Sequence, residues 1–473
     1  MICVAIGAQT LAQTPSSSAR QSQSPASDAG PQLREAASLL QRGRLAEAEP
    51  LLRSVLLKAP RNADAHNLLG IVLDQQAKFK AAEQEYRQAL RLNPSSISPL
   101  ANLGVLLART GRSEEAIGAF ETVLQRIPDH PQATLNLGVQ YVTRGDYERA
   151  LSLLERAAEL NGDSYQLRQT LGIALYNLKR YDEAVTAFHS ASVLSPRSGE
   201  PLYYLGLLSW ARHDETAATE FWRRAVQLRP DFAEANFMLG EALRKNRQTT
   251  AAIEYYQRAL EQDSTKFVYY ARLGGAHMLL LQFDKALELF QRAAMRFNLL
   301  PEAYYFVGIA ARGQGSYDVA ESAFRRVLKL QPDHIDALAQ LGFVVGERAR
   351  YEEAERFLRR AIELGNQHFF AHYDLGRLLV KTRRFEDAIP VLQRAATLRS
   401  NNPDVHYQLF LAYSRLKQKE LADREMTLFK TFDDERKARE KAGLSEQDDY
   451  IQTWSPTLPA NDTRTQKTPV LPH

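Results

Sequence analysis

Residues 63–96 read ADAHNLLGIVLDQQAKFKAAEQEYRQALRLNPSS, and this stretch contains one complete structural unit. Small and apolar residues around Gly70 recur at the spacing that places them on one face of a helix. After a short, mostly polar turn, Ala82 and Tyr86 belong to a second pattern of the same kind. Pro94 ends that pattern, because proline cannot continue a helix. The stretch therefore predicts two helices joined by a tight turn.

The same unit recurs without insertion along most of the chain. Glycine returns every 34 residues at Gly70, Gly104, Gly138, Gly172, Gly206, Gly240, Gly274, Gly308, Gly342 and Gly376. Alanine returns with the same period at Ala48, Ala82, Ala116, Ala150, Ala184, Ala218, Ala252, Ala286, Ala320, Ala354, Ala388 and Ala422. Small residues allow two helix backbones to approach, and a large residue four positions after each alanine is expected to fill the gap beside them. Two such rows in one register indicate a repeat protein.

The unit resembles the tetratricopeptide repeat, in which Leu-Gly on a first helix is followed by alanine and a large residue on a second helix. The resemblance covers residues 28–434. It implies an all-α fold, a right-handed α-solenoid of about twelve helix-turn-helix units of 34 residues. The same fold serves many tasks, so the resemblance specifies the architecture far more closely than the function.

The chain is expected to have four segments. Residues 1–28 are interpreted as a disordered leader and a candidate truncated signal peptide, residues 29–434 as the repeats, 435–443 as the end of a capping helix, and 444–473 as a disordered tail. The leader is apolar and then rich in serine and alanine, but it lacks the basic start of a complete signal. A periplasmic or secreted location is therefore slightly favoured over the cytoplasm, and an unstructured start is the alternative.

Composition and motifs argue against catalysis and against several classes of partner. The formal net charge is +4, too weak over 473 residues to indicate a nucleic-acid partner. A single cysteine, Cys3, excludes an internal disulfide, and no apolar run is long enough for a membrane span. No phosphate loop, zinc-binding histidine pair or nucleophile elbow is present. We expect no enzyme activity and no cofactor, and the oligomeric state is left open.

Two sets of side chains leave alternatives open. His368 and His372 are four residues apart and His406 follows one repeat later, so a metal site is one interpretation and packing in the repeat the other. We predict no metal, because a third ligand of the right type is missing nearby. A row of arginines is either a solvated helix surface or a ridge for an anionic partner: Arg156, Arg224, Arg258, Arg292, Arg326, Arg360 and Arg394.

The resemblance implies that the first helices line a concave groove, so their inward positions should decide what is bound. The predicted partner groove contains Asn102, Asn136, Tyr203, Tyr204, Trp210, Phe237, Tyr305, Phe306, Tyr373 and Tyr407. The aromatic rings are favoured binding anchors, and the alternative is that they only pack between adjacent first helices. The carboxylate clamp of the family's chaperone-tail receptors is not matched. Asn102 and Asn136 alone match the asparagine ladder of the family's sugar transferase.

The leading prediction is a non-catalytic scaffold that binds peptide or protein partners through this groove. The alternative is an accessory or docking subunit of a larger enzyme or cell-envelope assembly complex, which would use the opposite face. A short peptide partner would favour the first prediction, and a stable large subunit would favour the second.

Overall fold

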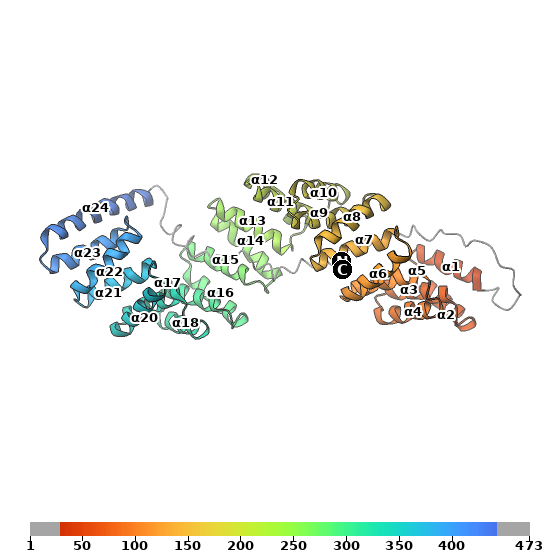
Figure 1. Ribbon diagram of the computed structural model, residues 1–473, viewed down its shortest axis with the longest axis horizontal. Coiled ribbons are helices and arrows are strands. Elements are labelled where there is room, and N and C mark those ends of the chain that lie inside the picture. The colour runs from red at the N-terminus through yellow and green to blue at the C-terminus, as the bar shows by residue number, and fades with distance from the viewer. Residues whose placement is uncertain (1–28, 442–473) are drawn as a thin grey trace. The chain divides into compact units, whose positions relative to one another are not determined.

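The computed structural model describes residues 29–441, which consist of 24 α-helices and contain no β-strand (Figure 1). The expected leader (1–28) and tail (444–473) lie outside the described residues. The helices divide into two compact units, unit 1 within residues 29–212 and unit 2 within residues 213–441. No helix of the described part is both long and apolar enough to cross a membrane. The predicted all-α repeat architecture is confirmed.

Odd-numbered helices are the first helices of the repeats, and even-numbered helices are the second. Unit 1 contains α1 (Ala29–Gln41), α2 (Leu45–Lys58), α3 (Ala63–Gln75), α4 (Phe79–Leu92), α5 (Ile97–Arg109), α6 (Ser113–Arg126), α7 (Pro131–Arg144), α8 (Tyr147–Asn161), α9 (Tyr165–Asn177), α10 (Tyr181–Leu194) and α11 (Glu200–Ala211). Unit 2 contains α12 (Glu215–Leu228), α13 (Ala233–Lys245), α14 (Thr249–Gln262), α15 (Phe267–Leu279), α16 (Phe283–Arg296), α17 (Pro301–Gln314), α18 (Tyr317–Leu330), α19 (Ile335–Glu347), α20 (Tyr351–Leu364), α21 (Phe369–Lys381), α22 (Phe385–Leu398), α23 (Pro403–Arg415) and α24 (Lys419–Lys441).

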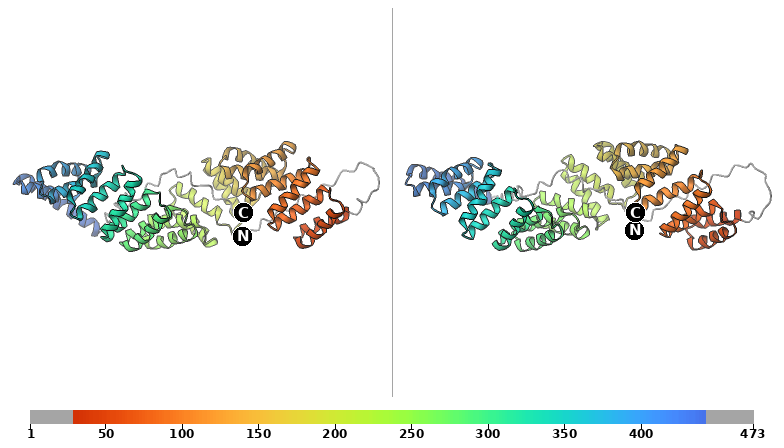
Figure 2. Two further views of the ribbon diagram at one scale, coloured as in Figure 1. Left: turned by 90° about the horizontal axis from the view of Figure 1, so that it is seen from below. Right: turned by 60° about the horizontal axis from the view of Figure 1, so that its bottom comes forward.

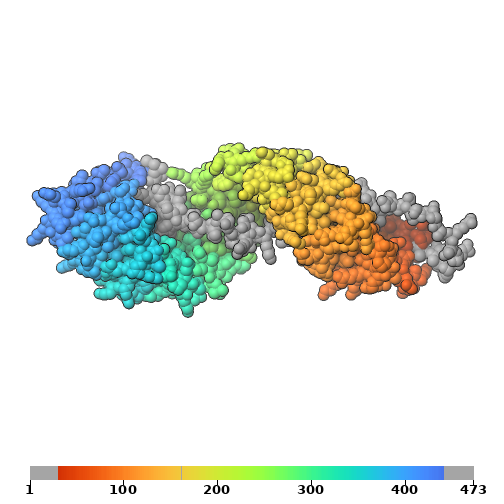
Figure 3. Space-filling view, in the orientation of Figure 1, coloured from red at the N-terminus to blue at the C-terminus, as the bar shows by residue number. Residues whose placement is uncertain are grey.

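In nine of the hairpins a glycine of the first helix lies against a large side chain of the second. A Cβ atom added at Gly70 would lie 2.6 Å from the ring of Tyr86, and one added at Gly172 would lie 2.6 Å from the ring of Phe188. Both rings are fully buried. The expected close approach at the glycine row is therefore confirmed. Within each unit the hairpins follow one another in chain order (Figures 2 and 3).

Side chains at the preceding residue cap six of the first helices. These side chains accept a hydrogen bond from the backbone N–H three residues later, which would otherwise have no partner. The six caps are Asn62, His130, Ser164, His334, His368 and Asn402, all at one repeat position. The local sequence thus starts each of these helices at the same point of the repeat.

The turn inside every hairpin contains one residue with a positive φ angle. Glycine occupies this position in four turns, at Gly43, Gly111, Gly145 and Gly315. In the other eight the residue has a side chain: Ala77, Lys179, His213, Arg247, Leu281, Ala349, Arg383 and Lys417. Left-handed backbone strains a residue that carries a Cβ atom. The repeat period therefore imposes a conformation that the local sequence does not favour.

The last helix, α24, continues without a break through the expected boundary at residue 434. On α24 the ring centre of Phe429 lies 5.2 Å from that of Tyr407, and the ring centre of Phe432 lies 5.4 Å from that of the His406 imidazole. The first part of α24 is thus the second helix of the last repeat, and the remainder extends it to Lys441. Ala422 is buried on the same helix, as the alanine row requires.

Candidate functional site

The first helices form the inner side of each unit. Helix α3 packs on α5 and α7 on α9, and in unit 2 α19 packs on α21 and α21 on α23. Within residues 29–441, no two neighbouring second helices are packed this closely. Ion pairs also join first helices, with Arg109 Nη1 2.7 Å from Asp74 Oδ1 and Arg377 Nη2 3.0 Å from a Glu347 oxygen. A partner lying along the first helices would therefore contact several repeats at once.

The two predicted asparagines do not form a ladder. The side-chain amide of Asn102 donates a 3.1 Å hydrogen bond to Asn67 Oδ1 on the preceding first helix. Asn136 is half-buried one repeat later, and among the described residues its side chain makes no hydrogen bond to Asn102. The structure thus brings Asn102 together with Asn67, which occupies the neighbouring inward position.

Unit 1 places three predicted aromatic residues on α11, in two different environments. Tyr204 is only 8% exposed, and its ring stacks on Phe188 at 4.7 Å with the planes 6° apart. Tyr203 is half-buried and meets Tyr204 edge to face at 5.3 Å. Trp210 is half-buried two turns further along. Tyr204 is therefore a core residue, as the packing alternative described, whereas Tyr203 and Trp210 keep part of their surface exposed.

Sequence reasoning missed Tyr176 on α9, which belongs to the same group of rings. Its ring lies 5.7 Å from Tyr204 and 6.0 Å from Tyr181, and it is half-buried. Burial raises the pKa of Tyr176. Tyr176 and Trp210 are 34 residues apart, so they occupy one repeat position on neighbouring first helices. That period could have identified Tyr176. We call Tyr176, Tyr203 and Trp210 the aromatic face.

In unit 2 the predicted rings show the same division. Phe306 is 7% exposed and stacks on Phe290 at 5.1 Å, which repeats the Tyr204–Phe188 contact three repeats later. Tyr305 is half-buried and stacks on His334 at 5.3 Å. Phe237 is half-buried, with its ring 5.0 Å from that of Tyr269.

The last two predicted aromatic residues lie near the end of unit 2. Tyr373 is half-buried and stacks on Phe369 at 6.0 Å, and burial raises its pKa to about 12. Tyr407 is 39% exposed, the most exposed of the predicted rings, and it packs against Phe429 of α24. The structure thus distributes the predicted groove residues over both units, some in the core and some partly exposed.

A charged group on α17, α19 and α21 was not predicted as a site. The guanidinium carbons of Arg312 and Arg377 lie 4.8 Å and 4.9 Å from the ring centre of Phe343. Arg312 also donates to the side-chain oxygen of Gln340, and Arg377 pairs with Glu347. Cation–π contacts of this kind hold both guanidinium groups in fixed positions. We call Arg312, Phe343, Glu347, Asp374 and Arg377 the charged face.

Asp374 is the buried acid of this face. It is 8% exposed, and its Oδ1 atom lies 3.8 Å from Arg377 Nε. Burial raises the pKa of Asp374 to about 6, because the charged carboxylate loses hydration that Arg377 replaces only in part. In unit 1 burial likewise raises the pKa of Asp74, and Arg109 opposes the rise.

The three histidines considered as metal ligands have structural roles. His368 caps α21 with its Nδ1 atom and places Nε2 3.0 Å from Asp336 Oδ1. His372 and His406 place Nε2 near the carbonyl oxygens of Asn366 (3.1 Å) and Ser400 (2.9 Å). Within the described residues no group of three or more histidine, cysteine or acidic side chains is arranged to hold a metal ion.

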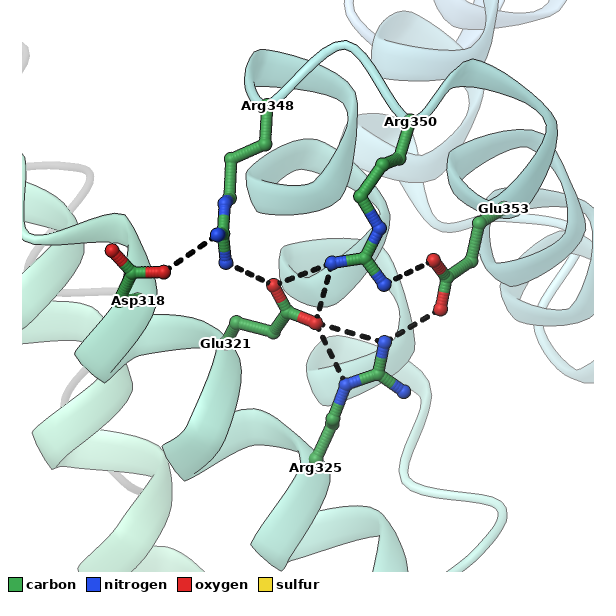
Figure 4. A network of polar contacts seen from close by, with 6 residues as sticks. All are labelled: Asp318, Glu321, Arg325, Arg348, Arg350 and Glu353. Atoms are coloured by element: carbon green, nitrogen blue, oxygen red, sulfur yellow. Dashed lines mark hydrogen bonds and ion pairs between the residues drawn. The ribbon is translucent and has the colours of Figure 1, made fainter.

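The second helices form a surface of paired charges. Glu321 on α18 lies among Arg325, Arg348 and Arg350, and Glu353 on α20 joins the same network (Figure 4). Burial raises the pKa of Glu321, but hydrogen bonds from Arg350 and Arg325 lower it more, so the net change is downward. These contacts link α18 to α20 and to the turn before it.

Members of the arginine row bond back toward the preceding inter-repeat turn. Arg156 Nη2 lies 2.8 Å from Asp129, and Arg360 Nη2 lies 3.0 Å from Asp333. Arg326 and Arg394 donate long hydrogen bonds of 3.5 Å to the carbonyl oxygens of Asn298 and Asn366. These contacts agree with the solvated-surface interpretation of the row.

Three family models match successive parts of this chain. A tetratricopeptide-repeat model matches residues 33–97, 169–231 and 215–266. The model for subunit 3 of the anaphase-promoting complex (cyclosome) matches residues 109–191, and the model for the middle TPR-like domain of cilia- and flagella-associated protein 70 matches residues 270–407. No curated protein matches the chain.

Solved structures that resemble parts of the chain include those of the following three proteins. YrrB, described as a TPR protein with an unusual peptide-binding site, is 23% identical over 39% of this chain and 95% of its own, with a TM-score of 0.35. PilF of Pseudomonas aeruginosa is 24% identical over 46% of this chain and 100% of its own, with a TM-score of 0.42. MamA is 25% identical over 34% of this chain and 94% of its own, with a TM-score of 0.31.

Proposed function

Because this chain belongs to the tetratricopeptide-repeat family, whose fold generally supports protein–protein interaction, we propose that it is a scaffold that holds a peptide partner along its first helices. The family is typically non-catalytic, and the proposal assigns no reaction to this chain. Partner binding would use the inner side of each unit, where consecutive first helices are in contact.

The aromatic face carries this proposal. Tyr176, Tyr203 and Trp210 are half-buried, so each ring is held by its neighbours while part of its surface stays exposed. Tyrosine and tryptophan are enriched among the residues that dominate binding energy, because they combine a large contact area with a polar tip. Rigid support is an advantage, since little side-chain entropy is lost when a partner binds. The stacked pair Tyr204–Phe188 in the core provides that support.

The test compares two double variants of the full chain in affinity capture. Tyr176→Ser with Tyr203→Ser removes rings from the aromatic face but leaves Tyr204 and Phe188 in the core. Loss of two anchor rings should weaken capture of the natural partner at least about tenfold, because each such ring typically contributes more than about 1 kcal/mol. The matched control is Tyr373→Ser with Tyr407→Ser, which removes two partly exposed rings from unit 2.

Thermal melting of both double variants establishes that the repeats remain folded. If the Tyr176/Tyr203 variant keeps its melting temperature and still captures the same partner at the same level, the aromatic face is not the binding surface. If the Tyr373/Tyr407 variant alone loses the partner, the binding surface lies in unit 2.

The alternative function is that of an accessory or docking subunit of a larger enzyme or cell-envelope assembly complex. Such a subunit would bind through its second helices, whose paired charges include the network around Glu321. A stable large protein that resists both double variants would favour this alternative, whereas a short peptide segment that is lost from one of them favours the first proposal.

A further inference from the structure

A groove opens between two second helices of unit 2, α20 and α22, above the first helix α21. Its volume is about 290 Å³. The lining residues are Arg359, Ile362, Glu363, His372, Leu375, Pro390, Val391 and Arg394. Pockets for whole small molecules usually measure about 300–1,000 Å³. This second-helix groove is therefore of a size suited to one or two side chains of a partner.

The groove exists because small residues occupy positions that neighbouring repeats fill. Val391 stands where the preceding repeat has Phe357, which packs against the buried cluster around Leu338. In the following repeat the same position is Glu425, whose carboxylate is bonded to His406. Pro390 replaces Arg356 and, lying within α22, presents a ring instead of a long charged side chain. The helices of the repeat are the same here, but the side chains that occupy this space in the neighbouring repeats are absent.

His372 at the bottom of the groove lacks a partner that its equivalents have. In two other repeats the Nδ1 atom of the histidine at this position lies 2.6 Å from a glutamate 19 residues later, in the pairs His66–Glu85 and His406–Glu425. For His372 the residue 19 later is Val391. His372 is 7% exposed, its Nδ1 atom is buried with no hydrogen-bond partner, and Nε2 is bonded to Asn366. The groove floor thus combines apolar surface with an unpaired acceptor.

The rim of the groove is positively charged where α22 meets it. Arg394 is exposed, and among the described residues its single hydrogen bond is the long one of 3.5 Å to Asn366. On the opposite rim Arg359 is paired with Glu355 at 2.7 Å, and Glu363 is paired with Arg360 at 3.2 Å. Arg394 can therefore still offer most of its guanidinium donors to a carboxylate, which such a fork binds well.

We propose that the second-helix groove is a docking site for a partner protein that inserts an apolar side chain next to an aspartate or glutamate. The apolar side chain lies between Ile362, Leu375 and Val391, where Phe357 and Glu425 lie in the neighbouring repeats. The carboxylate of the partner pairs with Arg394 at the rim. This groove lies between second helices of unit 2, whereas the aromatic face belongs to first helices of unit 1, so the two proposals are independent.

The test uses the full chain with isotope-labelled isoleucine, leucine and valine methyl groups. The probe is the blocked tripeptide acetyl-Asp-Phe-Asp-amide, with acetyl-Lys-Phe-Lys-amide and acetyl-Asp-Ala-Asp-amide as comparisons. We expect the methyl resonances of Val391 and Ile362 to shift on titration with the first peptide and to respond at least about tenfold more weakly to the others, which is the factor that about 1.4 kcal/mol produces.

Two variants locate the site and one serves as a control. Val391→Phe fills the groove as Phe357 fills its equivalent, and should abolish the shift at Ile362. Arg394→Glu should reverse the charge preference, so that the lysine peptide shifts Val391 more than the aspartate peptide does. Arg326→Ala changes the same repeat position two repeats earlier, where the side chain bonds to the carbonyl oxygen of Asn298 and does not line the groove, and should leave the titration unchanged.

The proposal is overturned if Val391 and Ile362 do not shift, if both charged peptides shift them equally, or if Val391→Phe binds the aspartate peptide as well as the unchanged protein does. Should Val391→Phe fail to fold, the charge reversal by Arg394→Glu decides the question, because Arg394 is exposed and its loss leaves the core intact.

Discussion

The aromatic face of unit 1 and the charged face of unit 2 use equivalent repeat positions for different chemistry. Tyr176 and Trp210 occupy the position at which unit 2 has Arg312, and Ile173 and Leu207 occupy the position of Phe343 and Arg377. Both faces rest on glycine contacts of the same kind inside the hairpins, such as Gly172 against Phe188 in unit 1 and Gly308 against Phe324 in unit 2. The difference shows that the repeat fixes the backbone, while two or three free positions on each first helix decide the character of the inner surface.

The largest expected effect comes from substitutions at the glycine positions that both units share, because these should destabilise both units alike. Gly172→Val in unit 1 and Gly308→Val in unit 2 would each drive a side chain into a buried ring, since an added Cβ atom would lie 2.6 Å from Phe188 and 2.5 Å from Phe324. Overpacking of this kind should destabilise each hairpin by roughly 3 kcal/mol or more. Hydrogen exchange of peptides from α9–α10 and α17–α18 measures the loss, because a repeat protein opens locally.

The matched controls are two glycines of the same helical arrays that face open space. Added Cβ atoms at Gly118 in α6 and Gly275 in α15 would meet nothing within 4 Å. Gly118→Val and Gly275→Val should therefore change stability by no more than about 0.5 kcal/mol. Equal losses in all four variants would show that the glycine row is not required for close approach.

The fold could be predicted from the sequence because those packing constraints recur at one period. Every repeat but the last, which has Phe410, has a small residue at the position of Gly70, and every repeat has a large one at the position of Tyr86, so the rows are visible without coordinates. The internal turns could not be read in the same way. Leu281 and Arg247 adopt a backbone that favours glycine, because closing the hairpin outweighs the local preference of one residue.

Acid titration distinguishes the buried aspartates of the two units, Asp374 and Asp74. Asp374 keeps its proton in the folded protein up to about pH 6, whereas the unfolded chain releases it near the ordinary aspartate pKa of 3.8. Because the folded state then binds more protons, stability should fall as pH rises through this window, by about 2–3 kcal/mol in all. Asp374→Asn should remove the slope and stabilise unit 2 at neutral pH, since Arg377 remains paired with Glu347.

Urea unfolding of both proteins at several pH values between about 4 and 7 measures this effect. The equivalent experiment in unit 1 is Asp74→Asn. It should give a smaller pH dependence and a net loss of stability, because Asp74 lies only 2.7 Å from Arg109, which would lose its carboxylate partner. A pH slope that survives Asp374→Asn would assign the dependence to another group.

The candidate site was less predictable than the fold. Tyr203 and Tyr204 are adjacent in the sequence and equal in chemistry, yet only the second stacks flat on Phe188 and is buried. Burial depends on which side of α11 meets the preceding second helix, and one residue rotates the side chain by about 100° around a helix. Tyr176 was missed because it stands about two turns beyond the row of Tyr203 and its equivalents, although its period with Trp210 is visible in the sequence.

The internal turns provide a smaller contrast between the units. Glycine occupies the positive-φ position in three of the five turns of unit 1, namely Gly43, Gly111 and Gly145, but only in the turn of Gly315 among the later ones from His213 onward. Leu281→Gly should therefore stabilise unit 2 by about 1 kcal/mol through relief of left-handed strain. Gly145→Leu should destabilise unit 1 by a similar amount. Denaturant midpoints of the two variants check the prediction, and opposite signs are required.

The smallest effect concerns His372 in unit 2, which lacks the glutamate partner that its equivalent His66 has in unit 1. Burial lowers the pKa of His372, so its contribution to stability is lost as pH falls below about 6.5 and the unfolded chain gains a proton that the folded one resists. His406, which has the Glu425 partner, shows the opposite direction, because the hydrogen bond to that carboxylate raises its pKa.

Val391→Glu supplies the missing partner at the same spacing of 19 residues. It should raise the pKa of His372 and reverse its pH dependence, so that its stabilisation of about 0.5–1 kcal/mol is present below about pH 6.5 and is lost as pH rises through the new value. Imidazole titration of His372 by NMR measures the change, with His406 in the same protein as the internal reference. An unaltered titration of His372 would mean that the glutamate position does not govern this histidine.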